Sequence, residues 1–320
     1  MRAAVIGHGV IGKHHVKILS EMGVLSAVCD VDKNALQGLE GIELYENYIE
    51  MLDKEKLDAV HICTPHHLHA EMIIAALDRS INVLCEKPLC IKKSDITLIL
   101  EAEKRSSAQL GVCHQNRYNP ATVFVKDYLK DKKIVGAYGS MVWNRGKDYY
   151  KSADWRGRFA TEGGGVLINQ ALHTLDLMQY FCQMPKFVTA SADNLSLKNV
   201  IEVEDTVSAV FDGDIPFTFF ATNASANDFP VEIKFKLSSG EIVSLLPRAA
   251  ITGGQYKEFP KSLLTVSGKS CYGSSHYYLF EDFYSCIKEG RHFPIDGAEG
   301  AKVVRLILTA YESNKEKIQI

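Results

Sequence analysis

Short apolar runs rich in β-branched residues alternate with longer helical patterns over the first 115 residues. The runs stand at 3–7, 24–29, 57–63, 81–85 and 109–113. Strands that alternate with helices form βαβ units, in which the strands lie parallel and helices cover both faces of the sheet. Residues 1–118 are therefore predicted to form an α/β domain with a doubly wound parallel sheet.

From Asn119 the pattern changes to one helical run followed by segments in which apolar and polar residues alternate. These segments lie at 134–149, 187–197, 203–211, 215–225, 230–237 and 241–246, with helical periodicity at 165–182, after Ser275 and at 297–315. Alternation of this kind is typical of an antiparallel sheet with one covered face. Residues 119–320 are predicted to form an α+β domain with a large, mostly antiparallel, open-faced sheet and helices.

Composition and charge narrow the class of protein. The chain has 320 residues, of which 46% are hydrophobic and 23% charged, and a formal net charge of -3. This composition suits two folded domains and lacks the basic excess of a nucleic-acid-binding protein. The first residues run directly into a strand pattern, and no apolar stretch is long enough to span a bilayer. We expect a cytoplasmic protein with neither nucleic acid nor membrane as a partner.

The eight cysteines are scattered without a C-x-x-C pair. Four of them, Cys29, Cys63, Cys85 and Cys113, fall at the ends of predicted strands. Small buried thiols suit such positions, and the spacing matches neither a disulfide framework nor a zinc site. We expect free thiols and no metal.

A glycine-rich turn follows the first predicted strand and opens a helical pattern. Its residues are Gly7, His8, Gly9, Val10, Ile11 and Gly12. Glycines at these spacings allow a tight turn, a close approach of the backbone to a pyrophosphate and close helix packing, and the helix N-terminus stabilises negative charge. This motif predicts a Rossmann dinucleotide site.

Asp30 ends the second predicted strand, 18 residues after Gly12. An acidic side chain there accepts hydrogen bonds from ribose hydroxyls and repels a 2′-phosphate, which favours NAD over NADP. Thr64 and Pro65 follow another strand, where they would either contact the cofactor or simply form a turn.

Several motifs follow one another in order over nearly the whole chain. They are the glycine turn, Thr64-Pro65 with Leu68-His69-Ala70-Glu71, Glu86-Lys87-Pro88, Gln115-Asn116-Arg117, Trp155-Arg156, Gly163-Gly164-Gly165, and His173 with Asp176. This series of motifs resembles that of the glucose-fructose oxidoreductase / inositol dehydrogenase (Gfo/Idh/MocA) family. The resemblance implies cofactor contacts for His69, Glu86, Lys87 and Gln115, and for Trp155 and Arg156 at the nicotinamide end. It also implies that Lys87 is catalytic and reaches the substrate, before a proline that we expect to be cis.

His173 is the candidate general base. The pattern predicts a helix on which Asn169, His173 and Asp176 share one face. A neutral histidine can take a proton from a hydroxyl near neutral pH. Inositol dehydrogenase-like members carry aspartate where this chain has Asn169, which cannot hold a proton for exchange. Asn169 followed by Gln170 resembles the branch that acts on sugar C3 positions, including UDP-linked amino sugar acids.

Further polar and aromatic residues are candidates for lining a carbohydrate pocket together with Lys87, Asn169 and His173. These are Arg117, Tyr118, Tyr149, Arg156 and His276, the last of which could equally be a neighbour of a helix cap.

The resemblance implies an NAD-dependent sugar or polyol dehydrogenase of carbohydrate metabolism that transfers a hydride between nicotinamide and a hydroxyl-bearing carbon. Two alternatives stay open. One is cleavage or epimerisation of a glycoside through transient oxidation with tightly bound NAD, and the other is a non-catalytic NAD-binding sensor. The outer face of the second sheet needs a cover, which in this family a partner subunit supplies, so a homodimer or homotetramer is expected.

Overall fold

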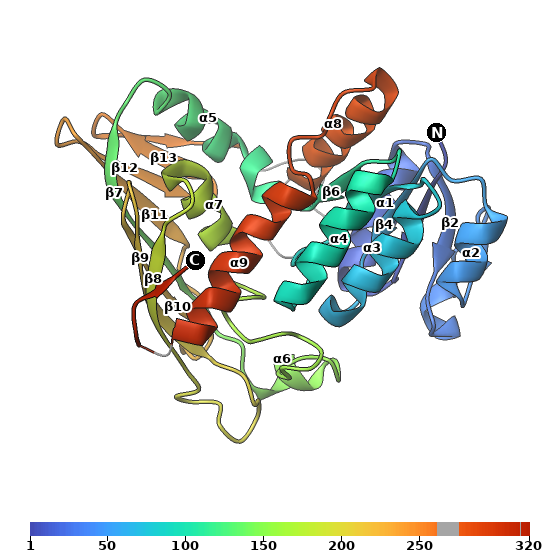
Figure 1. Ribbon diagram of the computed structural model, residues 1–320, viewed down its shortest axis with the longest axis horizontal. Coiled ribbons are helices and arrows are strands. Elements are labelled where there is room, and N and C mark those ends of the chain that lie inside the picture. The colour runs from blue at the N-terminus through green and yellow to red at the C-terminus, as the bar shows by residue number, and fades with distance from the viewer. Residues whose placement is uncertain (261–274, 314) are drawn as a thin grey trace. The chain divides into compact units, whose positions relative to one another are not determined.

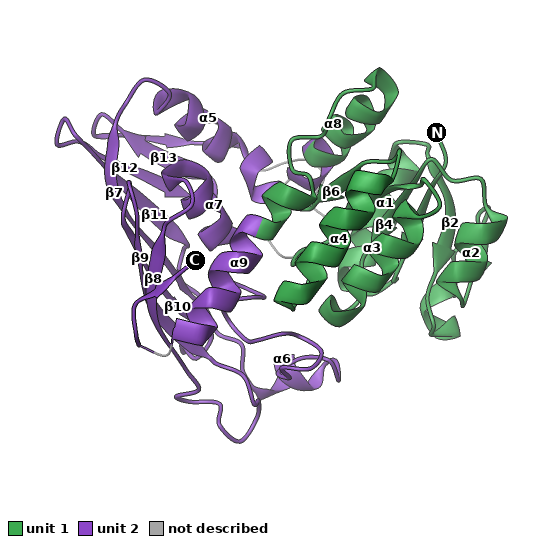
Figure 2. Ribbon diagram, in the orientation of Figure 1, with its two compact units in different colours: residues 1–113, 279–301 green, residues 114–278, 302–320 purple. Residues whose placement is uncertain are grey.

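A computed structural model describes residues 1–260, 275–313 and 315–320. Its chain divides into two compact units, which Figure 2 shows in different colours. Unit 1 comprises Met1–Cys113 and Leu279–Ala301, and unit 2 comprises His114–Tyr278 and Lys302–Ile320. Cys271 lies outside the described residues.

This division differs from the predicted boundary at two places. Residues 114–118 group with unit 2, and Leu279–Ala301 group with unit 1. The second difference has a physical cause, since this segment carries large aromatic side chains into the interior of unit 1. Phe280, Phe283 and Phe293 are completely buried, and Phe293 lies so close to Gly111 that an added Cβ there would be 3.0 Å from the ring.

Unit 1 contains a parallel sheet with the strand order β3-β2-β1-β4-β5-β6. Figure 1 labels β2, β4 and β6 of this sheet. The strands are β1 (Ala3–Ile6), β2 (Leu25–Cys29), β3 (Glu43–Tyr45), β4 (Ala59–Ile62), β5 (Asn82–Cys85) and β6 (Leu110–Val112). All residues of β1, β4 and β6 are buried, as expected for strands covered on both faces. The prediction of a doubly wound sheet is confirmed, although the short strand β3 was not predicted.

Helices follow most of these strands. They are α1 (Val10–Glu21), α2 (Tyr48–Lys54), α3 (His69–Leu77) and α4 (Lys93–Arg105), with 3-10 turns η1 (Lys33–Leu36) and η2 (His66–Leu68). Most of helix α8 (Ser275–Glu289) and the start of α9 (Gly297–Ser313) complete the unit. The ring of Phe280 on α8 packs edge-on against His15 of α1 and His61 of β4.

Unit 2 contains a mostly antiparallel sheet with the strand order β14-β13-β12-β11-β7-β10-β9-β8-β15. The strands are β7 (Ile134–Val142), β8 (Phe187–Asp193), β9 (Thr206–Asp212), β10 (Phe217–Thr222), β11 (Glu232–Leu237), β12 (Ile242–Leu246), β13 (Ala249–Thr252), β14 (Gln255–Glu258) and β15 (Ile318–Gln319). Strands β7 and β10 pair in parallel, whereas the other pairs are antiparallel. The predicted sheet is confirmed, and β13, β14 and β15 were missed.

One face of this sheet is covered by helix α7 (Leu172–Cys182), which packs on β7 and β10. The unit also holds η3 (Gln115–Tyr118), α5 (Pro120–Tyr128), α6 (Lys147–Lys151) and the end of α9. Two predictions were wrong in detail. The strand expected to reach residue 149 ends at Val142 and is followed by α6. The helix expected from residue 165 begins at Leu172, so Asn169 precedes it instead of sharing its face with His173.

No helix within the described residues is long and apolar enough to cross a membrane. The seven cysteines that the structure describes are free and buried.

Candidate functional site

In the glycine turn between β1 and α1, the glycines differ in the space available for a side chain. Gly7 has a φ of +92°, and an added Cβ would lie 2.7 Å from the carbonyl oxygen of Cys63; a Cβ on Gly12 would lie 1.8 Å from the carbonyl oxygen of Gly7. Both glycines are therefore required by packing within the protein. Gly9 differs, because a Cβ there would meet no atom within 4 Å. Gly9 and Val10 are exposed at the N-terminus of α1, where backbone N–H groups are open to an anion.

Asp30 directly follows β2 and reaches the same turn. Its Oδ2 accepts a hydrogen bond of 2.6 Å from the backbone N–H of His8, and its Oδ1 accepts one of 2.9 Å from the N–H of Asp32. The His8 ring is buried and its Nδ1 lies 2.7 Å from the carbonyl oxygen of Ala35. His8 thus helps to shape the turn through its backbone, and Asp30 is held beside it.

The loops after β4 and β5 are joined through His69. The His69 Nε2 is 2.9 Å from the carbonyl oxygen of Thr64, and its Nδ1 is 2.7 Å from that of Pro88. Burial lowers the pKa of this ring. Pro65 precedes η2, and the peptide bond between Lys87 and Pro88 is cis, as expected. His69 therefore lies between two loops that contain predicted cofactor residues, and its neutral ring can donate a hydrogen bond to either of the two carbonyl oxygens.

These loops share one edge of the sheet. The glycine turn, Asp30, Thr64 and Glu86-Lys87 follow β1, β2, β4 and β5, which are neighbours in the order β2-β1-β4-β5. Since the carboxyl ends of parallel strands lie at the same edge, the loops converge where open α/β sheets bind nucleotides. The open side of Gly9, the unopposed helix N-terminus and the carboxylate of Asp30 fit a dinucleotide.

The side chains of His15, Glu86 and Cys113 are buried, and their atoms that could bind a metal ion lie within 4.8 Å of one another. Burial, and next the charge of Glu86, raise the pKa of the Cys113 thiol well above its usual value. Since metals bind the thiolate, and Glu86 already bonds His15, we do not assign a metal site to this group.

In unit 2, His173 lies half-buried near the start of α7. Its Nε2 is 3.3 Å from the amide nitrogen of Gln115 on η3. An amide N–H in that position donates to an unprotonated ring nitrogen, the form that a general base needs. The structure therefore brings together two residues that the sequence assigned to the cofactor and to proton transfer.

Arg117 and Asp176 form a buried ion pair that links η3 to α7. The Nε of Arg117 is 2.8 Å from Asp176 Oδ2, and one terminal nitrogen is 2.5 Å from Oδ1. Burial acts to raise the pKa of Asp176, but Arg117 and His114 outweigh it and hold the pKa at about 2, below the ordinary 3.8. The pair anchors the helix that carries His173, and the substrate contact expected of Arg117 stays a prediction.

Tyr149, Arg156 and Asn169 lie together in a second cluster. The Arg156 guanidinium lies 4.3 Å from the centre of the Tyr149 ring and 5.4 Å from that of Trp155. The Tyr149 hydroxyl accepts hydrogen bonds from the side-chain amides of Asn169 at 3.4 Å and of Gln170 at 2.8 Å. Three of the predicted substrate residues and Trp155 are thus gathered in one region of unit 2.

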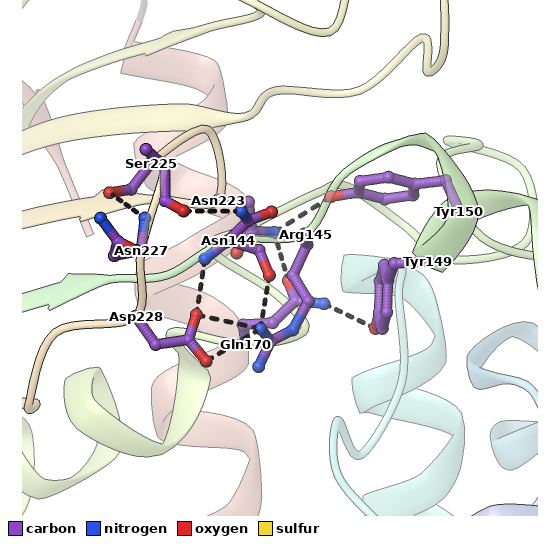
Figure 3. Close-up of polar contacts among 10 residues, drawn as sticks. Asn144, Arg145, Tyr149, Tyr150, Gln170, Asn223, Ser225, Asn227 and Asp228 are labelled. Atoms are coloured by element: carbon purple, nitrogen blue, oxygen red, sulfur yellow. Dashed lines mark hydrogen bonds and ion pairs between the residues drawn. The ribbon is translucent and has the colours of Figure 1, made fainter.

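Gln170 extends this cluster into a buried network. Its carbonyl oxygen accepts a hydrogen bond of 2.8 Å from Asn223, whose amide also donates to the Tyr150 hydroxyl at 3.0 Å (Figure 3). Asn223 follows β10, so the network fixes the turn before α7 to the sheet. This network could not be predicted from the sequence, because its members are far apart along the chain.

Glu162 is a second residue that the sequence did not single out. It is completely buried, accepts hydrogen bonds of 2.5 Å from Asn169 and from the backbone N–H of Gly157, and has its pKa raised to about 7, chiefly by burial. Glu162 therefore orients the Asn169 amide. Its position before the glycine run was the available clue.

The glycine run itself meets protein atoms. An added Cβ on Gly164 would lie 2.2 Å from the Tyr311 hydroxyl, and one on Gly165 would lie 1.9 Å from the carbonyl oxygen of Glu204. Glu204 also accepts hydrogen bonds from the N–H groups of Gly165 and Leu167. These contacts hold residues 163–171 in turns and explain why α7 starts late. Tyr118 is half-buried on η3, and His276 is buried in the first turn of α8.

Two family models match the chain. The model of an oxidoreductase family with an NAD-binding Rossmann fold matches residues 1–114, and the model of the GFO/IDH/MocA C-terminal domain matches residues 133–243.

Relatives and solved structures agree with this match. The inositol 2-dehydrogenase of Rubrobacter xylanophilus is 30% identical over 186 residues, which cover 56% of this chain and 51% of that protein. The myo-inositol 2-dehydrogenase of Thermotoga maritima is 25% identical over 191 residues, which cover 56% and 54%. The matched stretch thus spans about half the length of these relatives.

Two similar structures are the WlbA dehydrogenase from Bordetella pertussis in complex with NADH and UDP-GlcNAcA, and a levoglucosan dehydrogenase in complex with NADH and levoglucosan. The first has a TM-score of 0.85 and 24% identity over 100% of this chain and 98% of that one; the second has a TM-score of 0.87 and 20% identity over 100% and 99%. At these identities the similarity shows a shared fold.

The Arg117–Asp176 pair gives a test of how α7 is held. Arg117→Met would leave the buried carboxylate of Asp176 without its arginine partner, and we expect the free energy of unfolding at neutral pH to fall by about 3–5 kcal/mol. The double variant Arg117→Met/Asp176→Leu, which removes both charges, should recover most of this loss. Urea unfolding followed by circular dichroism measures both values.

The same pair predicts a pH dependence. Because the pKa of Asp176 is lower in the folded chain than the ordinary 3.8, its stabilisation is complete above that value and is lost as the pH falls toward about 2. The double variant Arg117→Met/Asp176→Leu has no carboxylate at this position, so it should not lose this stability as the pH falls. Equal stabilities of the single and double variants would contradict the role of the pair.

Proposed function

The chain belongs to the GFO/IDH/MocA oxidoreductase family, and on that premise we propose that it is an NAD-dependent dehydrogenase of sugars, sugar derivatives or polyols. The observation that carries the proposal is the convergence of four loops at the carboxyl ends of β2, β1, β4 and β5, with Gly9 open to a ligand. The names of the relatives, which act on inositol and levoglucosan, support the substrate class.

The cofactor residues have distinct roles in this proposal. The N-terminus of α1 and the open side of Gly9 would hold the pyrophosphate, and Asp30 would accept hydrogen bonds from ribose hydroxyls. Asp30 would also repel a 2′-phosphate, which favours NAD over NADP. Thr64, Pro65, His69, Glu86 and Gln115 are assigned to the cofactor as predicted from the sequence, and Trp155 and Arg156 to its nicotinamide end.

The reaction requires a proton acceptor and a group that stabilises charge on oxygen. A bound NAD would supply the acceptor for the hydride that leaves the carbinol carbon. In the oxidative direction, Nε2 of His173 takes the hydroxyl proton, and the substrate hydroxyl then replaces the Gln115 amide as its hydrogen-bond partner. The ammonium of Lys87 stabilises the negative charge that develops on the substrate oxygen. Tyr149, Arg156 and Asn169 offer hydrogen-bonding groups for substrate hydroxyls.

An assay of the purified chain with NAD and a panel of sugars, inositols, nucleotide sugars and glycosides tests the proposal. We expect NADH absorbance and a keto product for at least one member, and losses of about 100-fold or more in kcat for Lys87→Ala and His173→Ala. Product without net NADH would indicate transient oxidation with retained NAD. Cofactor binding without turnover on any member would indicate a sensor.

A matched pair of glycine variants tests the cofactor site separately. Gly9→Ala should fold with unchanged thermal stability, because the added methyl meets no protein atom, yet it should weaken NAD binding by narrowing the approach of the pyrophosphate. Gly12→Ala should lower the melting temperature, because its Cβ would collide with the carbonyl oxygen of Gly7. Calorimetry and NAD titration of both variants measure the contrast; unaltered NAD affinity in Gly9→Ala would count against the site.

We also propose that a second copy of the chain covers the outer face of the unit 2 sheet. Thr218 of β10 pairs with Tyr138 of β7 and Val210 of β9, so these three side chains form one row. Tyr138, Val210 and Phe220 are 42%, 49% and 36% exposed, which leaves an apolar surface on this row and next to it.

The location of the protein in the cytoplasm stays a prediction.

The oligomer can be tested by adding a charge to this row. Val210→Glu should shift the mass in light scattering from dimer or tetramer toward monomer, because a carboxylate in an apolar interface is costly. Val123→Glu is the control, since Val123 is similarly exposed, at 54%, but lies on α5. A monomeric wild-type chain would overturn this assignment.

A further inference from the structure

A chain of buried polar groups runs through unit 1 to the carboxylate of Glu86. His15 Nε2 is 3.1 Å from Glu86 Oε1, and His15 Nδ1 is 2.9 Å from His61 Nδ1. His61 Nε2 is in turn 3.0 Å from the Tyr284 hydroxyl. The four groups come from α1, β4, the end of β5 and α8, and the proposed reaction leaves three of them unused.

Burying the imidazoles of His15 and His61 in the interior of unit 1 costs free energy. Both histidine rings are completely buried, and His61 stands in the middle of β4, whose other residues are alanine, valine and isoleucine. The Phe280 ring packs edge-on against both imidazoles at 4.7 and 4.6 Å between ring centres. An apolar residue would pack here without any hydrogen bond, so the polar chain is not required by the fold alone.

With Glu86 ionised and His15 neutral, the contacts determine where the protons lie. An ionised Glu86 accepts from His15 Nε2–H, so the Nδ1 of a neutral His15 carries no proton and accepts from His61 Nδ1–H. The Nε2 of His61 is then free of a proton and accepts the hydrogen bond of the Tyr284 hydroxyl. Every hydrogen bond therefore points the same way, from Tyr284 to Glu86.

The surroundings favour this direction. Burial, and next the charge of Asp58, raise the pKa of Tyr284, which therefore keeps its proton. Burial, and next Glu86, raise the pKa of the thiols of Cys63, Cys85 and Cys113 at the ends of β4, β5 and β6, so these groups are neutral. His69 also lies near the charges of Glu86 and Lys87, and burial lowers the pKa of its ring.

We propose that His15, His61 and Tyr284 are positioning residues that keep Glu86 ionised and orient its carboxylate for the dinucleotide cofactor. The chain of hydrogen bonds occupies Oε1, while Oε2 lies 3.2 Å from the backbone nitrogen of Lys87 at the strand-end site. One additional proton on Glu86 would reverse all three hydrogen bonds, since His15 would then accept from the carboxyl and donate to His61. This inference rests on the proposed function for its cofactor role.

Two substitutions at His61 separate the chain of hydrogen bonds from packing. His61→Leu removes the donor to His15, and we expect the Kd for NAD at neutral pH to rise about tenfold, with binding lost at a higher pH than in the wild type on acidification. His61→Gln keeps an N–H that can donate to His15 and should restore both values. Phe280→Leu is the packing control and should lower stability without moving the pH midpoint of NAD binding.

Nitrogen NMR of the full chain with labelled histidine reads the protons directly. At neutral pH we expect His61 to carry its proton on Nδ1 and His15 to carry its proton on Nε2, with signals assigned from the variants. The opposite tautomers, equal pH midpoints in His61→Leu and His61→Gln, or a shifted midpoint in Phe280→Leu would each overturn the inference.

Failure of the inference and failure of the proposed function give different results. If the wild-type chain does not bind NAD, the proposed function is overturned together with the cofactor role of Glu86, whatever the tautomers are. If NAD binds equally well to the wild type and to His61→Leu at every pH, the function stands and the role of the positioning residues is overturned.

Discussion

The close packing of the first glycine turn against the end of β4 is the constraint on which the candidate cofactor site depends. Gly7 leaves no room for a side chain beside the carbonyl oxygen of Cys63, and Gly12 leaves none beside Gly7. This packing places the N-terminus of α1 directly at the sheet edge, next to Asp30 and Thr64. The exposed backbone at Gly9 then becomes the open side of an otherwise filled turn, which is what a bound pyrophosphate requires.

Most of the architecture was predictable from local patterns, and the misses have local causes. The buried strands β1, β2, β4 and β5 are apolar runs next to turns, so periodicity identifies them. Strands β3 and β15 are too short to show a period, and all four residues of β14 are exposed. The late start of α7 depends on Glu204, which binds the N–H groups of Gly165 and Leu167 from 37 or more residues away. No local pattern contains that information.

The candidate site was predictable where a motif has a fixed spacing and unpredictable where polar residues meet across the fold. Lys87 and the glycine turn belong to motifs, and the pairing of Gln115 with His173 joins two of them. Glu162 and His61 belong to no such motif, and residue type alone does not predict their burial, because glutamates are mostly exposed and histidines are intermediate. Only their complete burial and their partners identify them. Arg117 is the opposite case. Its motif assigns it to the substrate, whereas its guanidinium forms an ion pair with Asp176.

The return of the chain to unit 1 at residues 279–301 has a consequence for synthesis. Phe280 and Phe293 pack against His61 and Gly111, which leave the ribosome roughly two hundred residues earlier. Nascent unit 1 therefore emerges with an apolar face and the buried histidines uncovered until residues 279–301 have been synthesised. A chaperone that shields this face during elongation would protect the chain through its most aggregation-prone interval.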